Sequence, residues 1–140
     1  MAADLVENYE EHPAFELIER VPTSWDETRV LDAAIGDYVV IARRSGREWY
    51  AGAVTDENAR VLCAPLDFLE PGTTYAARIF EDAGGADCEV NPTPVEISSA
   101  LVDVGTILAL SLARGGGAAM AIAPASGEEI ATLPRYEARY

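Results

Sequence analysis

Residues 37–54 read DYVVIARRSGREWYAGAV, and this stretch decides the fold class. Its two halves, Asp37–Arg44 and Glu48–Val54, are rich in Tyr, Val, Ile and Trp, which are residue types enriched in β-strands. The connection between them, residues 45–47, contains a glycine and has the length of a tight turn. The stretch therefore predicts a β-hairpin.

The chain on either side of this hairpin repeats the same pattern. Gly, Pro, Asn or Asp separates most of the further strand candidates. These are Arg29–Leu31, Arg60–Ala64, Thr74–Phe80, Val95–Ser99, Thr106–Leu112 and Ala118–Ala123. Regularly spaced short strands with few helical patterns among them favour a sandwich or open barrel. We expect an all-β fold, an antiparallel β-sandwich of about eight strands with short N-terminal helices.

Residues 1–22 carry an intermittent apolar face that is typical of helix. Pro13 suits the first turn of a helix and Pro22 ends one, so we expect two short helices broken near residues 11–13. The expected organisation is a helical segment at 1–22, a β-sandwich domain at 23–124 and a C-terminal tail at 125–140. The tail is weakly patterned, and either lies across the sandwich or is partly disordered.

Charge is the most unusual bulk property of the chain. There are 24 Asp plus Glu against 10 Lys plus Arg, all of them Arg, and the net charge is -14. Such a charge disfavours nucleic acid and anionic membrane surfaces as partners. No secretory signal and no apolar stretch long enough to span a bilayer is present, so we predict a cytoplasmic location. High acidity without Lys favours a protein from a salt-adapted organism, and an ordinary acidic protein from a mesophile with a GC-rich genome is the alternative.

Metal and cofactor sites are not predicted. The chain has two cysteines, Cys63 and Cys88, and one histidine, His12. Two thiols cannot form a zinc site by themselves. Two free thiols are the favoured interpretation, and a disulfide between them is the alternative.

The densest polar and aromatic cluster is Trp25-Asp26-Glu27-Thr28, followed by Arg29. Asp26 and Glu27 have the residue types of a glycosidase acid/base pair. Adjacent residues of an extended chain point to opposite faces, however, so the two carboxylates do not easily converge on one bond. The structural alternative is favoured: Asp26 caps a turn, Arg29 pairs with a carboxylate and Trp25 packs where helix and sandwich meet. No catalytic residue is assigned.

The hairpin holds two further candidate sites. Arg43 and Arg44, with Glu48 across the hairpin, have the charge to bind an anion, although one cross-strand ion pair and one solvated Arg is favoured. Trp49 and Tyr50 are possible carbohydrate contacts, because aromatic faces stack on sugar rings. The two alternate faces, so at most one is expected to be exposed and core packing is favoured. The glycines at 115–117 lack the Lys and helix of a phosphate-binding loop and predict a tight turn.

Residues 21–31, VPTSWDETRVL, resemble the V-P-T-x-W-D-E-T-R-V-L motif of family 97 glycoside hydrolases. Blocks that resemble the family's A-R-R, W-Y-x-G, L-D-F-L and G-G-G elements follow in the same order, at 42–44, 49–52, 66–69 and 115–117. The resemblance runs from about Asp4 to Ile122. It implies the C-terminal β-sandwich, because residues 4–9 are similar to the last helix of the family's (β/α)8 barrel. The family usually keeps an Arg soon after the G-G-G element, where this chain is apolar.

The resemblance implies a non-catalytic accessory or oligomerisation domain, since the barrel that carries the catalytic carboxylates and the calcium site is missing from the match. The partner implied is a second copy, as a homodimer, or a glycosidase barrel. Two alternatives remain: a carbohydrate-binding module that uses Trp49 or Tyr50, and an accessory subunit that completes a separately encoded α-glycosidase barrel.

Overall fold

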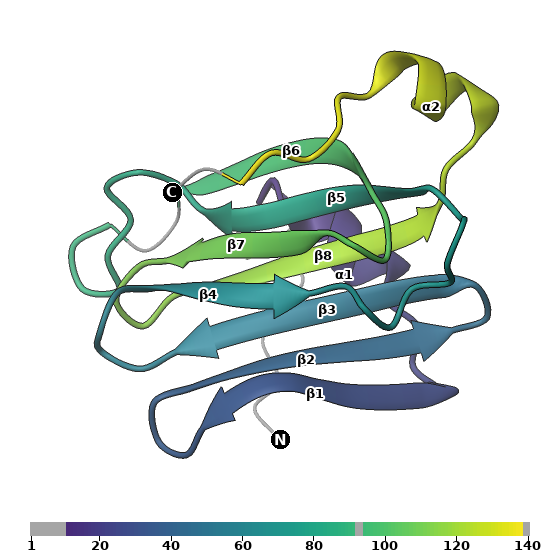
Figure 1. Cartoon of the computed structure of the whole chain (residues 1–140). Coiled ribbons are helices and arrows are strands. Elements are labelled where there is room, and N and C mark those ends of the chain that lie inside the picture. Colours follow the sequence, from purple (N-terminus) through teal and green to yellow (C-terminus); the bar gives the residue numbers. More distant parts are fainter. Residues whose placement is uncertain (1–10, 92–93, 139–140) are drawn as a thin grey trace.

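The computed structural model describes residues 11–91 and 94–138, and these form antiparallel strands with two short helices (Figure 1). The elements are α1 (Phe15–Arg20), β1 (Glu27–Ala34), β2 (Tyr38–Ser45), β3 (Glu48–Thr55), β4 (Arg60–Pro65), β5 (Tyr75–Asp82), β6 (Val95–Val102), β7 (Ile107–Leu112), β8 (Gly117–Pro124) and α2 (Gly127–Thr132). Each predicted strand is present. The expected all-β sandwich is confirmed.

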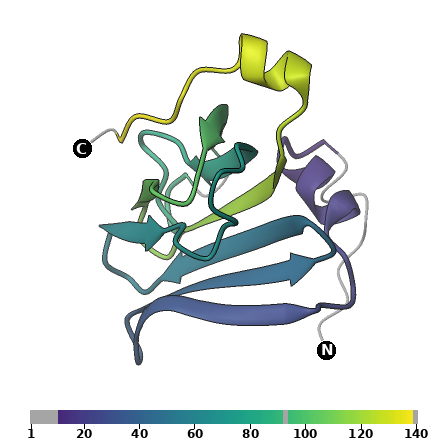
Figure 2. The same cartoon turned by 45° about the vertical axis from the view of Figure 1, so that its right-hand side comes forward.

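The strands form two sheets that face each other. The larger sheet has six strands in the order β1-β2-β3-β8-β5-β6, and β4 pairs with β7 in the smaller sheet. Figure 2 shows the smaller sheet lying over one face of the larger one. The core between them holds the buried side chains of Val40, Trp49, Leu62, Leu66, Ile79, Leu108, Leu110, Met120 and Ile122, among others. Burying one face of each sheet is the standard stabilisation of a sandwich.

The predicted hairpin is the pair β2–β3. Its register places Ser45 opposite Glu48, so the loop is the two residues Gly46-Arg47. Gly46 has a φ of 62°, and a glycine at the first loop position is the pattern of a type II′ turn. This turn matches the twist of the two strands and fixes their register.

Strand β1 is longer than predicted, and a β-bulge explains the difference. The pairing of β1 with β2 shifts between Val30 and Asp32. A bulge adds one residue and breaks the alternation of apolar and polar side chains on which the prediction depended. The strand therefore continues beyond Leu31, where the sequence pattern ends.

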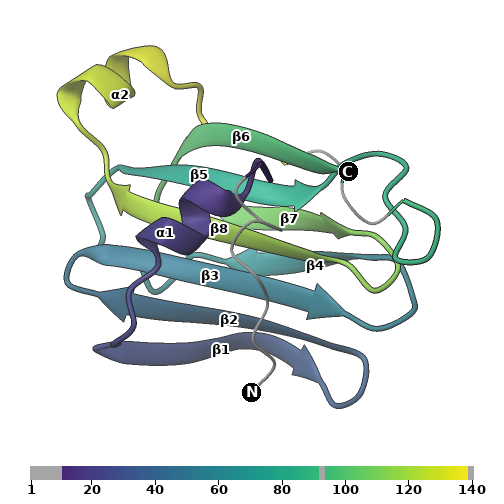
Figure 3. The ribbon, with the colours of Figure 1, turned by 180° about the vertical axis from the view of Figure 1, so that it is seen from behind.

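The N-terminal segment contains α1, which ends before Pro22 as predicted. The other expected helix falls mainly on residues 1–10 and lies outside the described residues. Helix α1 lies on the face of the larger sheet opposite the smaller sheet (Figure 3). Its N-terminal turn is stabilised by His12, whose Nδ1 accepts a hydrogen bond from the Ala14 N–H at 3.2 Å.

The C-terminal tail lies across the sandwich. It begins with α2, which the sequence analysis missed, and the helix has a capping box between Ser126 and Glu129. The chain then runs beside β6, where Leu101 exchanges backbone hydrogen bonds with Pro134 and Tyr136. The tail therefore occupies part of the open edge of β6.

Candidate interaction face

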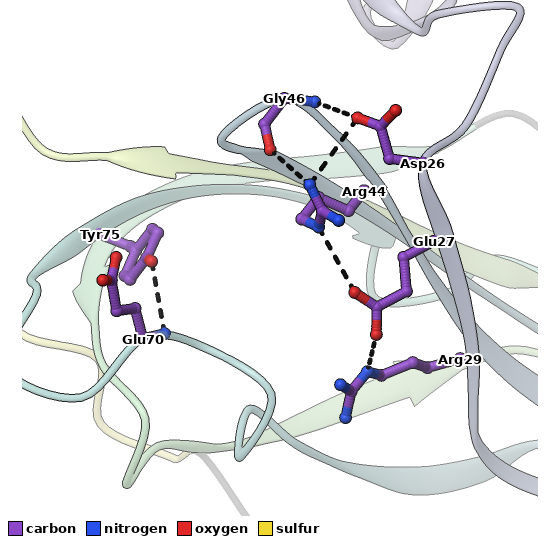
Figure 4. A network of polar contacts seen from close by, with 7 residues as sticks. All are labelled: Asp26, Glu27, Arg29, Arg44, Gly46, Glu70 and Tyr75. Atoms are coloured by element: carbon purple, nitrogen blue, oxygen red, sulfur yellow. Dashed lines mark hydrogen bonds and ion pairs between the residues drawn. The ribbon is translucent and has the colours of Figure 1, made fainter.

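The Trp25–Arg29 segment fastens the N-terminal end of the sandwich to the β2–β3 hairpin (Figure 4). The Asp26 carboxylate accepts a hydrogen bond from the Gly46 N–H at 2.8 Å. It also lies 3.7 Å from the Arg44 guanidinium, which donates to the Gly46 carbonyl at 3.0 Å. These contacts hold the hairpin turn and leave no carboxylate pair around an open site.

Glu27, the first residue of β1, completes this network through the same Arg44. Its carboxylate accepts from Arg29 at 2.6 Å and from Arg44 at 3.4 Å. The hydrogen bond from Arg29, followed by that from Arg44, lowers the pKa of Glu27 below its ordinary value. An acid with a lowered pKa stays ionised, and this is opposite to what a general acid requires. Thr28, the remaining motif residue, is exposed beside Arg43 in the strand register.

The two arginines of β2 differ in their surroundings. Arg44 turns to Asp26 and Glu27, while Glu48 pairs with Arg20 of α1 at 3.3 Å. Arg43 is exposed and stands 5.7 Å from the centre of the Trp25 ring. Arg43 has no ion pair with any carboxylate in the described parts of the chain. The structure thus separates the arginines and leaves one cation unpaired.

Trp49 and Tyr50 point to opposite faces of the larger sheet, and both are buried. Trp49 is 5% exposed in the core beside Phe68, and Tyr50 is 7% exposed with its ring edge-on to Trp25. The Tyr50 hydroxyl donates to Glu48 at 2.7 Å, and burial followed by this bond raises its pKa. Alternation along the strand allowed at most one of the two rings to be exposed, and the structure exposes neither. The N-terminal segment covers Tyr50, so neither ring offers an open face on which a sugar can stack.

The glycine turn at 115–117 holds a carboxylate of the protein itself. Asp82 accepts hydrogen bonds from the Ala113 N–H at 2.9 Å and the Gly117 N–H at 3.0 Å. Gly115 has a φ of 61°, which favours glycine. The turn joins β7 to β8 and its amide groups are occupied, so it has a structural role.

A largely apolar surface lies on the side of the larger sheet that carries α1, which we name the α1-side face. Alternation along β2 directs Val39, Ile41 and Arg43 to this face, because Val40 and Ala42 enter the core. The strand register then aligns Val30, Ile41 and Gly52 in one row across β1, β2 and β3. Val30 is 63% exposed and Val54 of the same face is 56% exposed.

Helix α1 covers only one half of this face. It packs near β5 and β8 (Figure 3). Leu17 and Ala14 line a hollow there with Phe80 and Ala119, and Glu16 pairs with Arg78 of β5. The hydrogen bond from Arg78 lowers the pKa of Glu16. No helix or strand of the described residues covers the outer surface of β1, β2 and β3, where Val30 and Val54 are exposed and Val39 and Ile41 are half-buried. We name this surface the uncovered half.

Between α1 and the uncovered half lies a groove of about 390 Å³. Leu17, Val21, Trp25, Val39, Ile41 and Tyr50 are among the residues that line it. Among the described residues of this lining, Arg43 is charged and none is acidic. An acid-free apolar surface is unusual on a chain with a net charge of -14, and such patches mark sites of contact with macromolecules. We take this face as the candidate functional site.

This face was not predicted from the sequence. A signal was present, because Val39, Ile41 and Val54 are apolar at positions that alternate with core residues. Strands with apolar residues on both faces are typically covered on both sides. Elsewhere, residues 11–91 and 94–138 contain no cluster of His, Cys, Asp and Glu suited to hold a metal ion. No described helix is long and apolar enough to cross a membrane.

Two antiparallel sheets packed face to face, with a partly apolar outer face, define the class of protein as a β-sandwich domain. The family model of the glycosyl-hydrolase 97 C-terminal, oligomerisation domain matches residues 24–123. The chain belongs to this family, so the expected resemblance is confirmed.

Known relatives are much longer proteins. A retaining alpha-galactosidase of Bacteroides thetaiotaomicron is 35% identical over 128 residues, which cover 87% of this chain and 18% of the relative. A glycoside hydrolase family 97 enzyme of Pseudoalteromonas sp. strain K8, solved in complex with acarbose, superposes with a TM-score of 0.84 at 42% identity. That match covers 90% of this chain and 20% of the enzyme. A beta-arabinopyranosidase structure superposes with a TM-score of 0.66 at 28% identity, covering 85% and 18%.

The chain thus spans about a fifth of the length of these relatives, and it aligns with their C-terminal domain. The catalytic barrel is absent from these 140 residues, and the non-catalytic assignment follows from this alignment.

Proposed function

We propose that this domain is a homodimerisation module of a family 97 glycosidase system, and that the α1-side face is the surface that associates. The family is one of oligomerisation domains, which supports self-association in general. The proposal that this particular face associates rests on the uncovered half, which exposes the apolar side chains of Val30 and Val54. The groove beside it has no acidic residue among its described lining.

Electrostatics explains why an apolar groove without acidic residues matters. Two copies with a net charge of -14 each repel one another at long range, and the repulsion is greatest where carboxylates face carboxylates. Contact through the α1-side face brings apolar side chains together and keeps most carboxylates in water. Each apolar Å² that is buried contributes about 25 cal/mol, so Val30, Val39, Ile41 and Val54 provide a driving force.

Light scattering on a gel-filtration column tests the proposal directly. The mass is measured at about 0.15 M and about 1 M NaCl, because salt screens the repulsion between acidic copies. A concentration-dependent dimer that is favoured at the higher salt supports the proposal. A chain that is monomeric in both buffers at about 0.1 mM contradicts it.

A second candidate function is the docking of a glycosidase barrel in trans. It is favoured by the position of α1, the first described element, on the same face as the uncovered half, because relatives carry the rest of their chain before this domain. Co-purification of a tagged copy with a separately encoded barrel from the same organism tests it.

The environment is the last part of the proposal. We propose a cytoplasmic location in a salt-adapted organism. Cys63 and Cys88 are both exposed and unpaired, which suits a reducing compartment, and the acidic surface without Lys suits high salt.

A further inference from the structure

The shape of the α1-side face is complementary to itself. One half carries α1, and no described helix or strand lies over the other half, so two copies can interlock if the helix of each occupies the uncovered half of the other. A two-fold axis that is parallel to the strands and midway between the two larger sheets relates the copies in this arrangement. Rotation about this axis leaves the direction of the strands unchanged. It places the covered half of each copy opposite the uncovered half of the other.

Helix α1 has the side chains that a position between two sheets requires. Leu17 points to its own sheet, where it lines the grooves on both sides of the helix. Glu16 and Arg20 fasten the helix to β5 and β3. Ile18 and Glu19 point away from the direction of Leu17, because each successive helix residue is turned by about 100°. Ile18 is 58% exposed, although it is a large apolar residue.

The charges on this surface fit the same arrangement. Glu19 is exposed and has no hydrogen bond or ion pair within the described residues, and Arg43 of the uncovered half has no carboxylate partner there. Both lie at the hairpin end of the sheet, because Arg20 next to Glu19 pairs with Glu48, and Arg43 is opposite Tyr50 in the register. An axis along the strands keeps the two at the same end, so Glu19 of one copy meets Arg43 of the other.

We propose that two copies dimerise by placing α1 of each in the uncovered half of the other, with Ile18 against Val39 and Ile41 and with Glu19 paired to Arg43 twice. The inference rests on the proposed self-association and adds its geometry. In this dimer the two larger sheets face each other with the two helices side by side between them, and the smaller sheets lie on the outside. This single contact gives Arg43 a carboxylate partner, buries Ile18 and covers the uncovered half.

Two charge reversals test this geometry. In a homodimer of the Glu19→Arg variant, the new arginine of each copy faces Arg43 of the other. In a homodimer of the Arg43→Glu variant, the new glutamate of each copy faces Glu19 of the other. Either change therefore places two pairs of like charges in the contact. Each variant alone is expected to dimerise about tenfold more weakly than wild type at about 0.15 M salt. An equimolar mixture of the two variants contains only opposite-charge contacts in the heterodimer. Its affinity is expected to return to within about threefold of wild type, as measured by sedimentation velocity with one variant labelled.

The controls separate this geometry from self-association itself. Circular dichroism checks that each variant is folded, and Val61→Asp, on the exposed surface of the smaller sheet, is expected to leave the dimer unchanged. Wild-type protein that stays monomeric overturns the proposed function. Wild-type dimers that tolerate both reversals, or variants that stay weak when mixed, overturn the geometry alone and assign this face to another role, such as docking of a preceding domain.

Discussion

The Tyr136 hydroxyl holds the C-terminal tail to the edge of β7 through Ala109. Its oxygen accepts from the Ala109 N–H at 2.9 Å and its hydroxyl donates to the Ala109 carbonyl at 3.3 Å. The backbone of the same residue bonds to Leu101 of β6. One residue therefore joins the smaller sheet to the larger one on the side where the sandwich is open, and it occupies strand edges that would otherwise be free to pair with other chains.

Replacement of Tyr136 by Phe is expected to lower the free energy of unfolding by about 1–2 kcal/mol, because two backbone groups of Ala109 lose their partner. Urea denaturation followed by circular dichroism measures the change. Tyr38→Phe is the matched control, since its hydroxyl donates to an exposed Asp32 carboxylate and water can replace that partner. Equal midpoints for Tyr136→Phe and wild type would show that the tail does not fasten the two sheets.

Gly116→Ala is expected to destabilise the domain by about 2–4 kcal/mol. A Cβ atom at this position overlaps the Asp82 carboxylate, which then leaves the Ala113 and Gly117 amides without an acceptor. Gly52→Ala is the control, because the nearest atom to a Cβ there is the Ala118 carbonyl oxygen at 4.0 Å. Thermal unfolding compares the two. A Gly116→Ala protein with wild-type stability would falsify the structural role of the glycine turn.

Asp56 is expected to contribute stability that depends on pH. Hydrogen bonds from the Asn58 N–H, the Asn58 amide and Arg60 hold the pKa of Asp56 below its ordinary value of 3.8. The folded protein therefore binds this proton less readily than the unfolded chain does. The resulting stabilisation is complete above the unfolded pKa of about 3.9 and is lost as the pH falls through the lower folded pKa.

Asp56→Asn is thus expected to be less stable than wild type at pH 7 and to approach wild type below about pH 4. Guanidinium titrations at several pH values measure the difference. Glu57→Gln removes the same charge from the next residue and corrects for the change in net charge. A difference between Asp56→Asn and wild type that is constant from pH 7 to pH 3 would contradict the assigned role of the Asp56 contacts.

Salt is expected to stabilise the fold. The net charge of -14 produces self-repulsion, and most of this repulsion is screened when the Debye length falls to about 3 Å at 1 M salt. The midpoint of thermal unfolding should rise by several degrees between about 0.05 M and about 1 M NaCl. The measurement is made below the dimerisation concentration, because association also raises the midpoint. A midpoint that falls with added NaCl would argue against the proposed salt adaptation.

Local patterns were sufficient to place the strands. The hairpin of residues 37–54 was predicted with its turn, since Gly46 satisfies a local requirement for positive φ. Strand β1 was predicted too short because its bulge interrupts the alternation. Helix α2 was missed although Ser126 and Glu129 have the spacing of a capping box, since a helix of this length provides no apolar periodicity to detect.

The sequence by itself determined the fold class, the family and the eight strand positions, because alternation, turn residues and ordered motifs are encoded within a few neighbouring residues. Only the tertiary structure decided which strands share a sheet and which face stays open. Tyr50 shows the reason: its burial depends on α1 and Trp25 folding over β3, and contacts between distant segments have no local signature. The same long-range packing covers one half of the α1-side face and leaves Arg43 and Val30 exposed on the other.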